Sequence, residues 1–311
     1  MLHARALLGR VAINGRSQLA QGARHRSQHR SVVTAAAGMQ FWAARVCPYA
    51  QRGYIALKET GVPFEFKSVD LHDKSPEFVE LYRRIVCDDT ANAKVPVLID
   101  GELEITESPV VAEYVLRRYG ADTDILPAYP AATAKAKLWA ELFGANVGAA
   151  QVAILKSDTK TKLAEAEEKM VHALTVMDAF LRSQGSDDGG SFFLGKQYSI
   201  AEVLTTSLLQ RALAYTKAYR GVDLWRLVAD AKLARLEAWM KAAMERPSGS
   251  ILPDAKAAAK LLIGKAVVGV VPRHMRQRIG PRAGVASQLL GGRGKSVYAS
   301  LAIARDRCSA R

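Results

Sequence analysis

The chain has 311 residues, of which 49% are hydrophobic and 24% are charged, so it has the composition of a globular protein and is long enough for more than one domain. Its net charge of +14 comes from the two ends. Residues 1–38 hold six Arg and no acidic residue, and residues 255–311 hold twelve Lys or Arg and one Asp. Residues 39–254 therefore carry a net charge of −3, which argues against a nucleic-acid groove. The three cysteines exclude a disulfide framework and indicate a reducing compartment, and no apolar run reaches the ~20 residues that a membrane-spanning helix needs.

Residues 1–38 are predicted to be an organellar targeting leader. Their six Arg are spread along the segment, Ser and Ala are frequent, and the first acidic residue of the chain is Glu59, which is typical of a transit peptide. Small residues from Val32 to Gly38 suit a processing site. We predict a chloroplast location, with the mitochondrion as the alternative because residues 2–10 could also form a short basic amphipathic helix.

Residues 39–119 are predicted to form a thioredoxin-like α/β domain. The pattern predicts a strand at 40–43, a helix from 48 to about 60, a β-rich run at 64–71, a short helix at 76–86, a hairpin at 97–105 and a final helix. In the hairpin, Asp100-Gly101 supplies the positive φ angles of a tight turn. Ser108 is predicted to be the N-cap of the final helix, with Pro109 at its first position. A β-α-β unit followed by a hairpin and a helix is the thioredoxin-like arrangement.

Residues 120–130 are predicted to be a linker, and residues 131–250 an all-helical domain. A stripe of apolar residues at helical spacing runs over 163–181. Residues 199–202, Ser-Ile-Ala-Glu, form a capping box that begins another helix. Pro247 ends the last helical run, so the second domain is predicted to be a helical bundle.

Residues 251–311 are predicted to be a basic, poorly ordered C-terminal extension. The run 261–271 is apolar but short, and the residues after it are rich in Arg and Gly. The alternative is a basic arm that contacts an anionic membrane or a partner surface.

Cys47 stands at the junction of the first predicted strand and the first predicted helix. It is predicted to be the N-cap of that helix, with Pro48 as the first helical residue, and the positive end of the helix dipole favours a nucleophilic thiolate. Ala50 stands where a Cys-x-x-Cys motif would have its second thiol, so a mixed disulfide on Cys47 must be resolved by an outside thiol such as glutathione. The alternative is a small core cysteine. Arg52 is interpreted as a helix-surface arginine, with support of the thiolate as the alternative.

Three further features stand where a glutathione site on a thioredoxin-like domain needs them. Val95-Pro96 precedes a hairpin strand and is predicted to have a cis peptide bond, which leaves the N–H and C=O of Val95 free to pair with an extended peptide ligand. Glu107-Ser108 marks a second helix N-terminus that could bind a carboxylate, and Lys74 could offer a cation to another. Taken singly, Ser108 would be a simple helix cap and Lys74 a solvated surface lysine.

Three short motifs therefore occur in order before the all-helical segment: Cys-Pro-Tyr-Ala-Gln-Arg at 47–52, Lys-Val-Pro-Val-Leu at 94–98 and Glu-Ser at 107–108. In these motifs the chain resembles a cysteine-type glutathione transferase, and the similar classes are omega, lambda and dehydroascorbate reductase. The resemblance covers about residues 39–250 and implies that Cys47 is catalytic and forms a mixed disulfide with glutathione. It also implies glutathione-binding residues, which are Pro48 and Tyr49 beside the sulfur, Val95 and Pro96 at the cysteinyl backbone, Glu107 and Ser108 at the γ-glutamyl end, and Lys74 near the glycyl end.

Two features depart from the family's pattern. Residues 85–94 occupy the place of a shorter Asn-Pro-containing turn, which is expected to reshape the glycyl end of the site around Lys74. Cys87, in this segment, is interpreted as a passive small residue, with a resolving thiol as the alternative. Glu202 stands where the family usually has Asp in the capping box, and because Glu can make the same reciprocal bond we expect no consequence.

The resemblance implies a redox and detoxification enzyme, namely a glutathione-dependent thiol transferase and reductase that acts on glutathione mixed disulfides and dehydroascorbate. Glutathione is the expected co-substrate, small electrophilic or disulfide molecules are the expected substrates, and the oligomeric state stays open, with a homodimer as one arrangement. The six histidines lack metal-ligand spacing, so no metal is expected. The alternative function is a non-enzymatic module that binds ligands or partners. A third function is glutathione conjugation through Tyr49.

Overall fold

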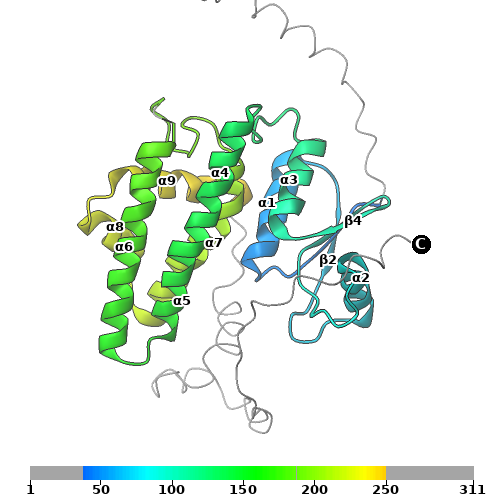
Figure 1. Ribbon diagram of the computed structural model, residues 1–311, viewed down its shortest axis with the longest axis horizontal. Coiled ribbons are helices and arrows are strands. Elements are labelled where there is room, and N and C mark those ends of the chain that lie inside the picture. The colour runs from blue at the N-terminus through cyan, green and yellow to red at the C-terminus, as the bar shows by residue number, and fades with distance from the viewer. Residues whose placement is uncertain (1–37, 187, 250–311) are drawn as a thin grey trace, which may run out of the picture. The chain divides into compact units, whose positions relative to one another are not determined.

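The structure, a computed structural model, describes residues 38–186 and 188–249. The predicted leader, apart from Gly38, and the predicted C-terminal extension lie outside these residues, and both stay predictions. The described part begins with a sheet and its helices and continues with a series of helices (Figure 1). This arrangement is the predicted one, a thioredoxin-like α/β part followed by a helical part.

The sheet has the strand order β2-β1-β3-β4. Its strands are β1 (Gln40–Ala43), β2 (Glu65–Ser68), β3 (Val97–Asp100) and β4 (Leu103–Thr106). β1 pairs in parallel with β2 and antiparallel with β3, and β3 pairs antiparallel with β4. A parallel pair needs a crossover connection, which helix α1 (Pro48–Thr60) supplies, whereas a tight turn joins β3 to β4. Gly101 in that turn has a φ of 62°, as the Asp-Gly pair predicted.

Helix α1 packs against the sheet and against α3 (Ser108–Tyr119), while α2 (Pro76–Val86) lies apart from this pair of helices (Figure 1). The approach of α1 to its neighbours is close because Gly53 has no side chain. A Cβ atom at this position would lie 3.0 Å from Phe41 Cε2 and 3.0 Å from Val111 Cγ1. This close packing holds in place the helix that begins just after Cys47.

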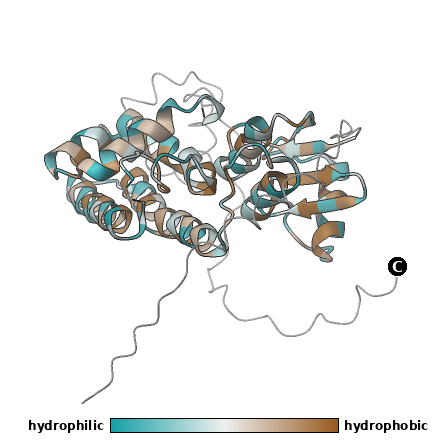
Figure 2. Cartoon of the chain, turned by 90° about the horizontal axis from the view of Figure 1, so that it is seen from above, coloured by the Kyte–Doolittle hydropathy of each residue, from teal (hydrophilic) through white to brown (hydrophobic). Residues whose placement is uncertain are grey.

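The helical part follows the α/β part along the chain. It contains α4 (Pro130–Phe143), the π-helical η1 (Gly144–Gly148), α5 (Ala149–Lys156), α6 (Lys160–Gln184), α7 (Ile200–Arg220), α8 (Leu224–Asp230), α9 (Ala234–Glu245) and the short 3₁₀ turn η2 (Pro247–Gly249). These helices carry both hydrophilic and hydrophobic residues, as amphipathic helices around a core do (Figure 2). The core is aromatic, since the fully buried rings of Trp139 and Trp239 lie 4.9 Å apart between centroids.

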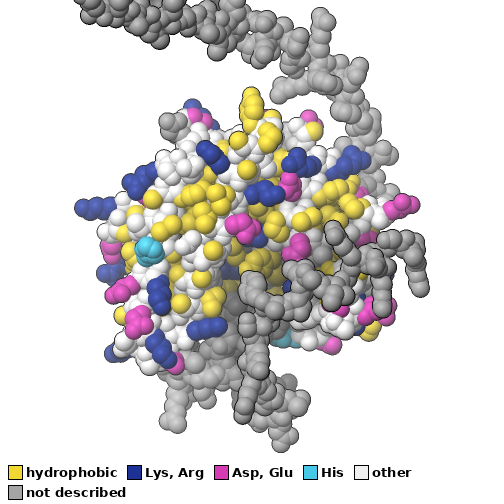
Figure 3. Space-filling model, in the orientation of Figure 1, with side chains coloured by type: hydrophobic (Ala, Val, Ile, Leu, Met, Phe, Trp, Pro, Cys, Tyr) yellow, Lys and Arg dark blue, Asp and Glu magenta, His cyan; other side chains and the backbone are white. Residues whose placement is uncertain are grey.

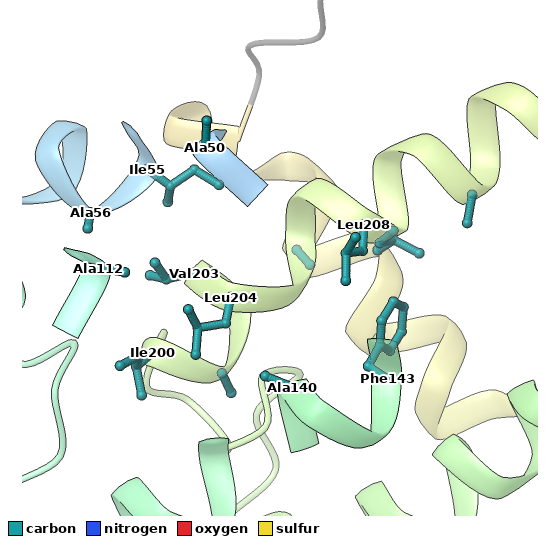
Figure 4. Close-up of a cluster of buried hydrophobic side chains, with 14 of the residues drawn as sticks. Ala50, Ile55, Ala56, Ala112, Ala140, Phe143, Ile200, Val203, Leu204 and Leu208 are labelled. Atoms are coloured by element: carbon teal, nitrogen blue, oxygen red, sulfur yellow. The ribbon is translucent and has the colours of Figure 1, made fainter. Parts of the chain in front are cut away.

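Helix α7 connects the helical part to the α/β part. Figure 4 shows Val203 of α7 beside Ala112 of α3, and Leu208 of α7 above Phe143 of α4. All four of these side chains are buried. One helix therefore contacts both parts of the described chain, and polar residues on its surface can reach the first turn of α1.

The predicted capping box begins α7. Ser199 N–H donates to Glu202 Oε2 at 3.0 Å, and Ala201 N–H donates to Ser199 Oγ at 3.2 Å. The expected reciprocal bond of Glu202 is confirmed, and Glu202 Oε1 also accepts from Phe193 N–H at 2.7 Å and from Trp239 Nε1–H at 2.9 Å. Burial raises the pKa of this carboxyl group, and the hydrogen bonds oppose that shift. Glu202 therefore joins α7 to α9 as well as capping its own helix.

The turn η2 brings the last described residues against α1. The carbonyl of Gly249 accepts from Gln51 Nε2 at 3.5 Å and from Gln210 Nε2. Just before the turn, Arg246 donates from Nε and Nη2 to the two carboxylate oxygens of Glu59 at 2.9 and 2.6 Å. The end of the helical part is thus bound to both the first and the last turns of α1.

One helical run among the described residues, Pro130–Lys156, has the length and mean hydropathy (1.3) of a membrane span, although no apolar run of that length was expected. A core helix of a globular domain meets the same criterion, and Trp139 and Ile154 of this run are fully buried. Leu138 and Val152 of the same run are exposed. Figure 3 shows that hydrophobic side chains gather on one face of the molecule.

Candidate functional site

Cys47 is the N-cap of α1, as predicted. Its backbone is extended (φ −79°, ψ 119°), Pro48 is the first helical residue, and the side chain makes no capping hydrogen bond. The cysteine is half-buried, and its carbonyl accepts from Gln51 N–H at 3.1 Å. As the N-cap residue, Cys47 places its sulfur at the positive end of the helix dipole. Because the sulfur does not cap its own helix, it is available for chemistry.

Arg52 lies one turn beyond Cys47 and is only 7% exposed, so its interpretation as a helix-surface arginine is wrong. Its Nε donates to the Leu204 carbonyl of α7 at 2.7 Å, and its Nη1 donates to Ser108 Oγ of α3 at 3.3 Å. Its guanidinium lies 5.2 Å from the ring centroid of Tyr49, which is 53% exposed. Arg52 therefore connects three helices beside the cysteine.

A second buried arginine, Arg211 of α7, reaches the same turn from the helical part. Its Nη2 donates to the carbonyl of Val46 at 3.1 Å, directly before Cys47. Its Nη1 donates to Gln51 Oε1 at 2.6 Å and to the Ser207 carbonyl at 2.9 Å. The cysteine thus has arginines from α1 and from α7 near it.

The electrostatic environment of both arginines includes Cys47. Burial lowers the pKa of Arg52, and the negative charges of Tyr49, Glu141 and Cys47 oppose that shift. Burial likewise lowers the pKa of Arg211, opposed by Tyr215 and Cys47. Both guanidiniums therefore lie within electrostatic reach of Cys47.

Val95 and Pro96 precede β3, and the peptide bond between them is cis, as predicted. The carbonyl of Pro96 accepts from Thr106 Oγ1 at 2.8 Å. Neither the N–H nor the C=O of Val95 makes a hydrogen bond to another residue of the described ranges. Both groups are therefore available to an extended ligand, as a strand edge is.

Glu107, rather than Ser108, is the N-cap of α3, so the predicted start of this helix is off by one residue. Glu107 is exposed and has a φ of 68°, an angle that favours glycine and costs about 1–3 kcal/mol in other residues. Ser108 is buried at the first helical position, and its hydroxyl oxygen accepts from Arg52. The interpretation of Ser108 as a simple cap is therefore wrong.

Lys74 is half-buried, and its Nζ donates to Asn92 Oδ1 at 2.9 Å. This bond ties Lys74 to the segment 85–94 that departs from the family's pattern. Cys87 in that segment is exposed at the C-cap of α2, with a φ of 54°. The structure thus places Lys74 in contact with the unusual segment through an exposed hydrogen bond.

The structure brings only part of the predicted set together by direct contact. Arg52 contacts both Tyr49 and Ser108 next to Cys47, whereas Lys74 bonds to Asn92 of the segment 85–94. Sequence reasoning missed Arg211, which lies far along the chain in a helix that was predicted only from its N-terminal capping box. The signal that could have found it is a run of polar residues, 205–207 and 210–211, in a helix that is buried on most sides.

Comparisons with known proteins support a likeness to glutathione transferases in general. Residues 37–117 match the family model described as "Glutathione S-transferase, N-terminal domain". The chain is 27% identical over 201 residues to Glutathione S-transferase U1 of Arabidopsis thaliana, covering 65% of this chain and 80% of that protein.

Solved structures share the fold. A tau-class glutathione S-transferase from mango (Mangifera indica) has a TM-score of 0.61 at 21% identity, covering 73% of this chain and 98% of that one. Glutathione transferase Omega 3C from Trametes versicolor has a TM-score of 0.59 at 20% identity, covering 78% of this chain and 91% of that one. The predicted fold class is confirmed, and the mango protein belongs to a class that the motifs did not indicate.

Proposed function

We propose that this chain is a member of the glutathione S-transferase family and a glutathione-dependent thiol transferase and reductase that works through a mixed disulfide on Cys47. The observation that carries the proposal is the position of this cysteine, half-buried at the N-terminus of α1 with its side chain free of any capping bond. A thiolate there can attack a disulfide sulfur.

The places of Ala50 and Cys87 in the fold indicate how the cycle closes. Ala50 is buried where a second cysteine would lie, and the other described cysteine, Cys87, is exposed at the end of α2. A mixed disulfide on Cys47 is therefore released by an external thiol, for which glutathione is the substrate that the family supplies.

The reaction is an exchange of sulfur bonds. The Cys47 thiolate attacks the glutathione sulfur of a mixed disulfide, a new bond forms between Cys47 and glutathione, and the substrate thiolate leaves. A second glutathione thiolate then attacks the same glutathione sulfur, so that glutathione disulfide forms and Cys47 leaves as a thiolate. With dehydroascorbate, two glutathione molecules supply the two electrons and two protons, and ascorbate and glutathione disulfide are the products.

The proposed glutathione-binding residues fit an extended, doubly anionic peptide. The unpaired backbone groups of Val95 can pair with its cysteinyl backbone. The Ser108 oxygen accepts from Arg52, so its own O–H is free to donate to a carboxylate at the N-terminus of α3. We assign Glu107 to the ammonium of the γ-glutamyl group because it is exposed at that same terminus.

The remaining assignments carry over from the resemblance. Pro48 and Tyr49 are the first two residues of α1, directly after the cysteine, and Pro96 sets the course of the backbone that leads into β3. Lys74 is assigned to the glycyl end of glutathione. Because Lys74 bonds to Asn92, the segment 85–94 is assigned to this end of the site as well.

The test is intact mass after incubation with glutathione disulfide, followed by peptide mapping. We expect one glutathione adduct, on Cys47, in the wild type and in Cys87→Ser, and no such adduct in Cys47→Ser. Reduction of hydroxyethyl disulfide and of dehydroascorbate should fall to the background rate in Cys47→Ser and stay at the wild-type rate in Cys87→Ser. Equal rates in the wild type and Cys47→Ser would refute the enzymatic proposal and leave the non-enzymatic binding module.

A second candidate function is conjugation of glutathione to electrophiles, which the likeness to a tau-class transferase favours. In that case the group at position 47, or the exposed Tyr49, would activate the glutathione thiol without forming a disulfide. Cys47→Ser would then retain or gain conjugation with an aryl halide, and Tyr49→Phe separates the two groups. A loss of both activities in Cys47→Ser would leave only the cysteine-based function.

A further inference from the structure

Two buried guanidiniums lie beside Cys47 without a carboxylate partner. Arg52 is 7% exposed and Arg211 is 3% exposed, and neither forms an ion pair with any Asp or Glu of the described ranges. Their hydrogen bonds go to neutral carbonyl, hydroxyl and amide oxygens. Because a buried cation without a counter-charge is costly, an anion at this position is expected.

Arg211 bonds to a backbone carbonyl directly before the cysteine and to a side chain one helical turn after it. It donates to the carbonyl of Val46, directly before Cys47, and to the side chain of Gln51, whose N–H bonds to the Cys47 carbonyl. Its Nε is buried and has no hydrogen-bond partner within the described residues. One donor of this arginine is thus uncommitted next to the first turn of α1.

Other charged or titratable groups face this region from neighbouring elements. They are Arg45 and Tyr49 beside the cysteine, Arg52 on α1, Glu141 on α4, and Tyr215 next to Arg211 on α7. Glu141 is exposed and opposes the arginines, whereas Arg211 is buried. Charges in a buried site interact more strongly than exposed ones, so the guanidiniums outweigh Glu141.

We propose that Arg211 is a positioning residue that supplies, from the helical part, the counter-charge of the Cys47 thiolate. The inference rests on the proposed thiol-exchange function and adds a residue that no motif of the α/β part contains. Arg52 provides a second charge from α1, with its Nε and Nη1 donating to Leu204 and Ser108.

The same charge serves both halves of the exchange. Arg211 increases the fraction of attacking thiolate in the first step, and it stabilises Cys47 as the leaving thiolate when the second glutathione attacks the mixed disulfide. No proton or electron passes to Arg211 in either step. The thiolate therefore depends on the packing of α7 against α1, and the α/β part alone would not provide this stabilisation.

The test uses the full chain and follows alkylation of Cys47 by iodoacetamide as a function of pH, with peptide mass spectrometry to separate Cys47 from the other cysteines. In Arg211→Met we expect the midpoint of the rate profile to rise by about one pH unit, which is a tenfold loss of thiolate below the midpoint. Arg211→Lys keeps the positive charge but lacks the planar guanidinium, so the midpoint should rise less than in Arg211→Met. Release of a preformed glutathione adduct by glutathione should slow in Arg211→Met as well.

The matched control is Arg220→Met, on the same helix. Arg220 also has a buried Nε without a partner in the described ranges, and burial also lowers its pKa, but it donates to Leu155 and faces Asp158 instead of Cys47. Its profile should match that of the wild type. An unshifted profile in Arg211→Met, or an equal shift in Arg220→Met, would overturn the inference.

Gln51→Glu gives a second approach if Arg211→Met does not fold. This change keeps an acceptor for Arg211 Nη1 but places a negative charge on it, so the midpoint should rise, and an unchanged midpoint contradicts the inference. Failure of the proposed function looks different: the wild type would take up no glutathione adduct, whatever the profile of the Arg211 variants.

Discussion

Arg52 of α1 donates from Nη1 to the hydroxyl oxygen of Ser108, the first residue of α3, at 3.3 Å. This bond joins the helix that begins at the cysteine to the helix whose N-terminus is proposed to hold a carboxylate. The same arginine donates to the Leu204 carbonyl of α7. A single side chain therefore sets the relative positions of three helices around the candidate site.

Arg52→Met should lower the free energy of unfolding by about 3 kcal/mol, because it removes two buried hydrogen bonds from a charged group and leaves Leu204 and Ser108 without their donor. Arg52→Lys should recover only part of this loss, since an ammonium group cannot span both acceptors. Chemical denaturation measures the difference. The control is Arg226→Met, whose side chain is 81% exposed, and it should change stability little. An Arg52→Met variant as stable as the control would contradict this role.

Gly53→Ala should destabilise the protein by about 1–3 kcal/mol, because the added methyl group would overpack against the Phe41 ring and Val111. Gly148→Ala is the matched control, since a Cβ there would meet nothing within 4 Å, and the change should be neutral or stabilising. Thermal or chemical unfolding compares the two. If both substitutions behave alike, close packing of α1 is not what makes glycine necessary at position 53.

Glu202→Ala should lower the free energy of unfolding by about 3 kcal/mol or more, because Phe193 N–H, Trp239 Nε1–H and Ser199 would lose a buried acceptor. The free energy of unfolding of Glu202→Asp should lie between those of the wild type and Glu202→Ala. The shorter Asp side chain can keep the bond to Ser199 but cannot reach Trp239.

The control for this series is Glu168→Ala, a change at an exposed position of α6. Denaturant unfolding followed by Trp fluorescence would report all three variants. Equal stability of Glu202→Asp and the wild type would show that the bonds to Phe193 and Trp239 add nothing.

Glu59 should make stability depend on pH. Burial raises its pKa, but the hydrogen bonds from Arg246 and Ser248 outweigh burial, so the pKa lies below its ordinary value of 4.5. A carboxylate with a lowered folded-state pKa adds stability above about pH 4.5 and loses it as the pH falls through the folded value. The wild type should therefore be more stable than Glu59→Gln at pH 7, and the difference should shrink toward pH 3.

Unfolding by denaturant at a series of pH values tests this dependence. Glu65→Gln is the control, because Glu65 forms an ion pair with Lys67 but its side chain is 57% exposed, and such pairs contribute about 0–1 kcal/mol. A difference between wild type and Glu59→Gln that stays constant from pH 7 to pH 3 would show that the ionised carboxylate is not the source.

Local signals in the sequence predicted much of the fold. The proline after Cys47, the Asp-Gly turn at 100–101 and the capping box at 199–202 each act over a few residues, and the structure has all three where they were expected. The predicted start of α3 was off by one residue. Glu107 and Ser108 can each precede a first turn that contains Pro109, and only the backbone angle of Glu107 shows which of them is the N-cap.

The charged surroundings of the cysteine could not be predicted in this way. Whether Arg52 is exposed depends on whether another helix covers it, and α7, which does so, lies far along the chain. Arg211 sits at an ordinary helical position and gains its relevance only by reaching Val46. Contacts between distant segments follow from packing, which a single sequence read by local pattern does not contain.

The carbonyl of Gly249 accepts hydrogen bonds from Gln51 and Gln210, beneath the turn that follows Cys47. Any shortened form of the protein must therefore retain residues through Gly249 if its chemistry is to be compared with that of the full chain. A label or fusion partner attached directly after this glycine would begin next to α1 rather than at a remote end, so such additions belong at a greater distance along the chain.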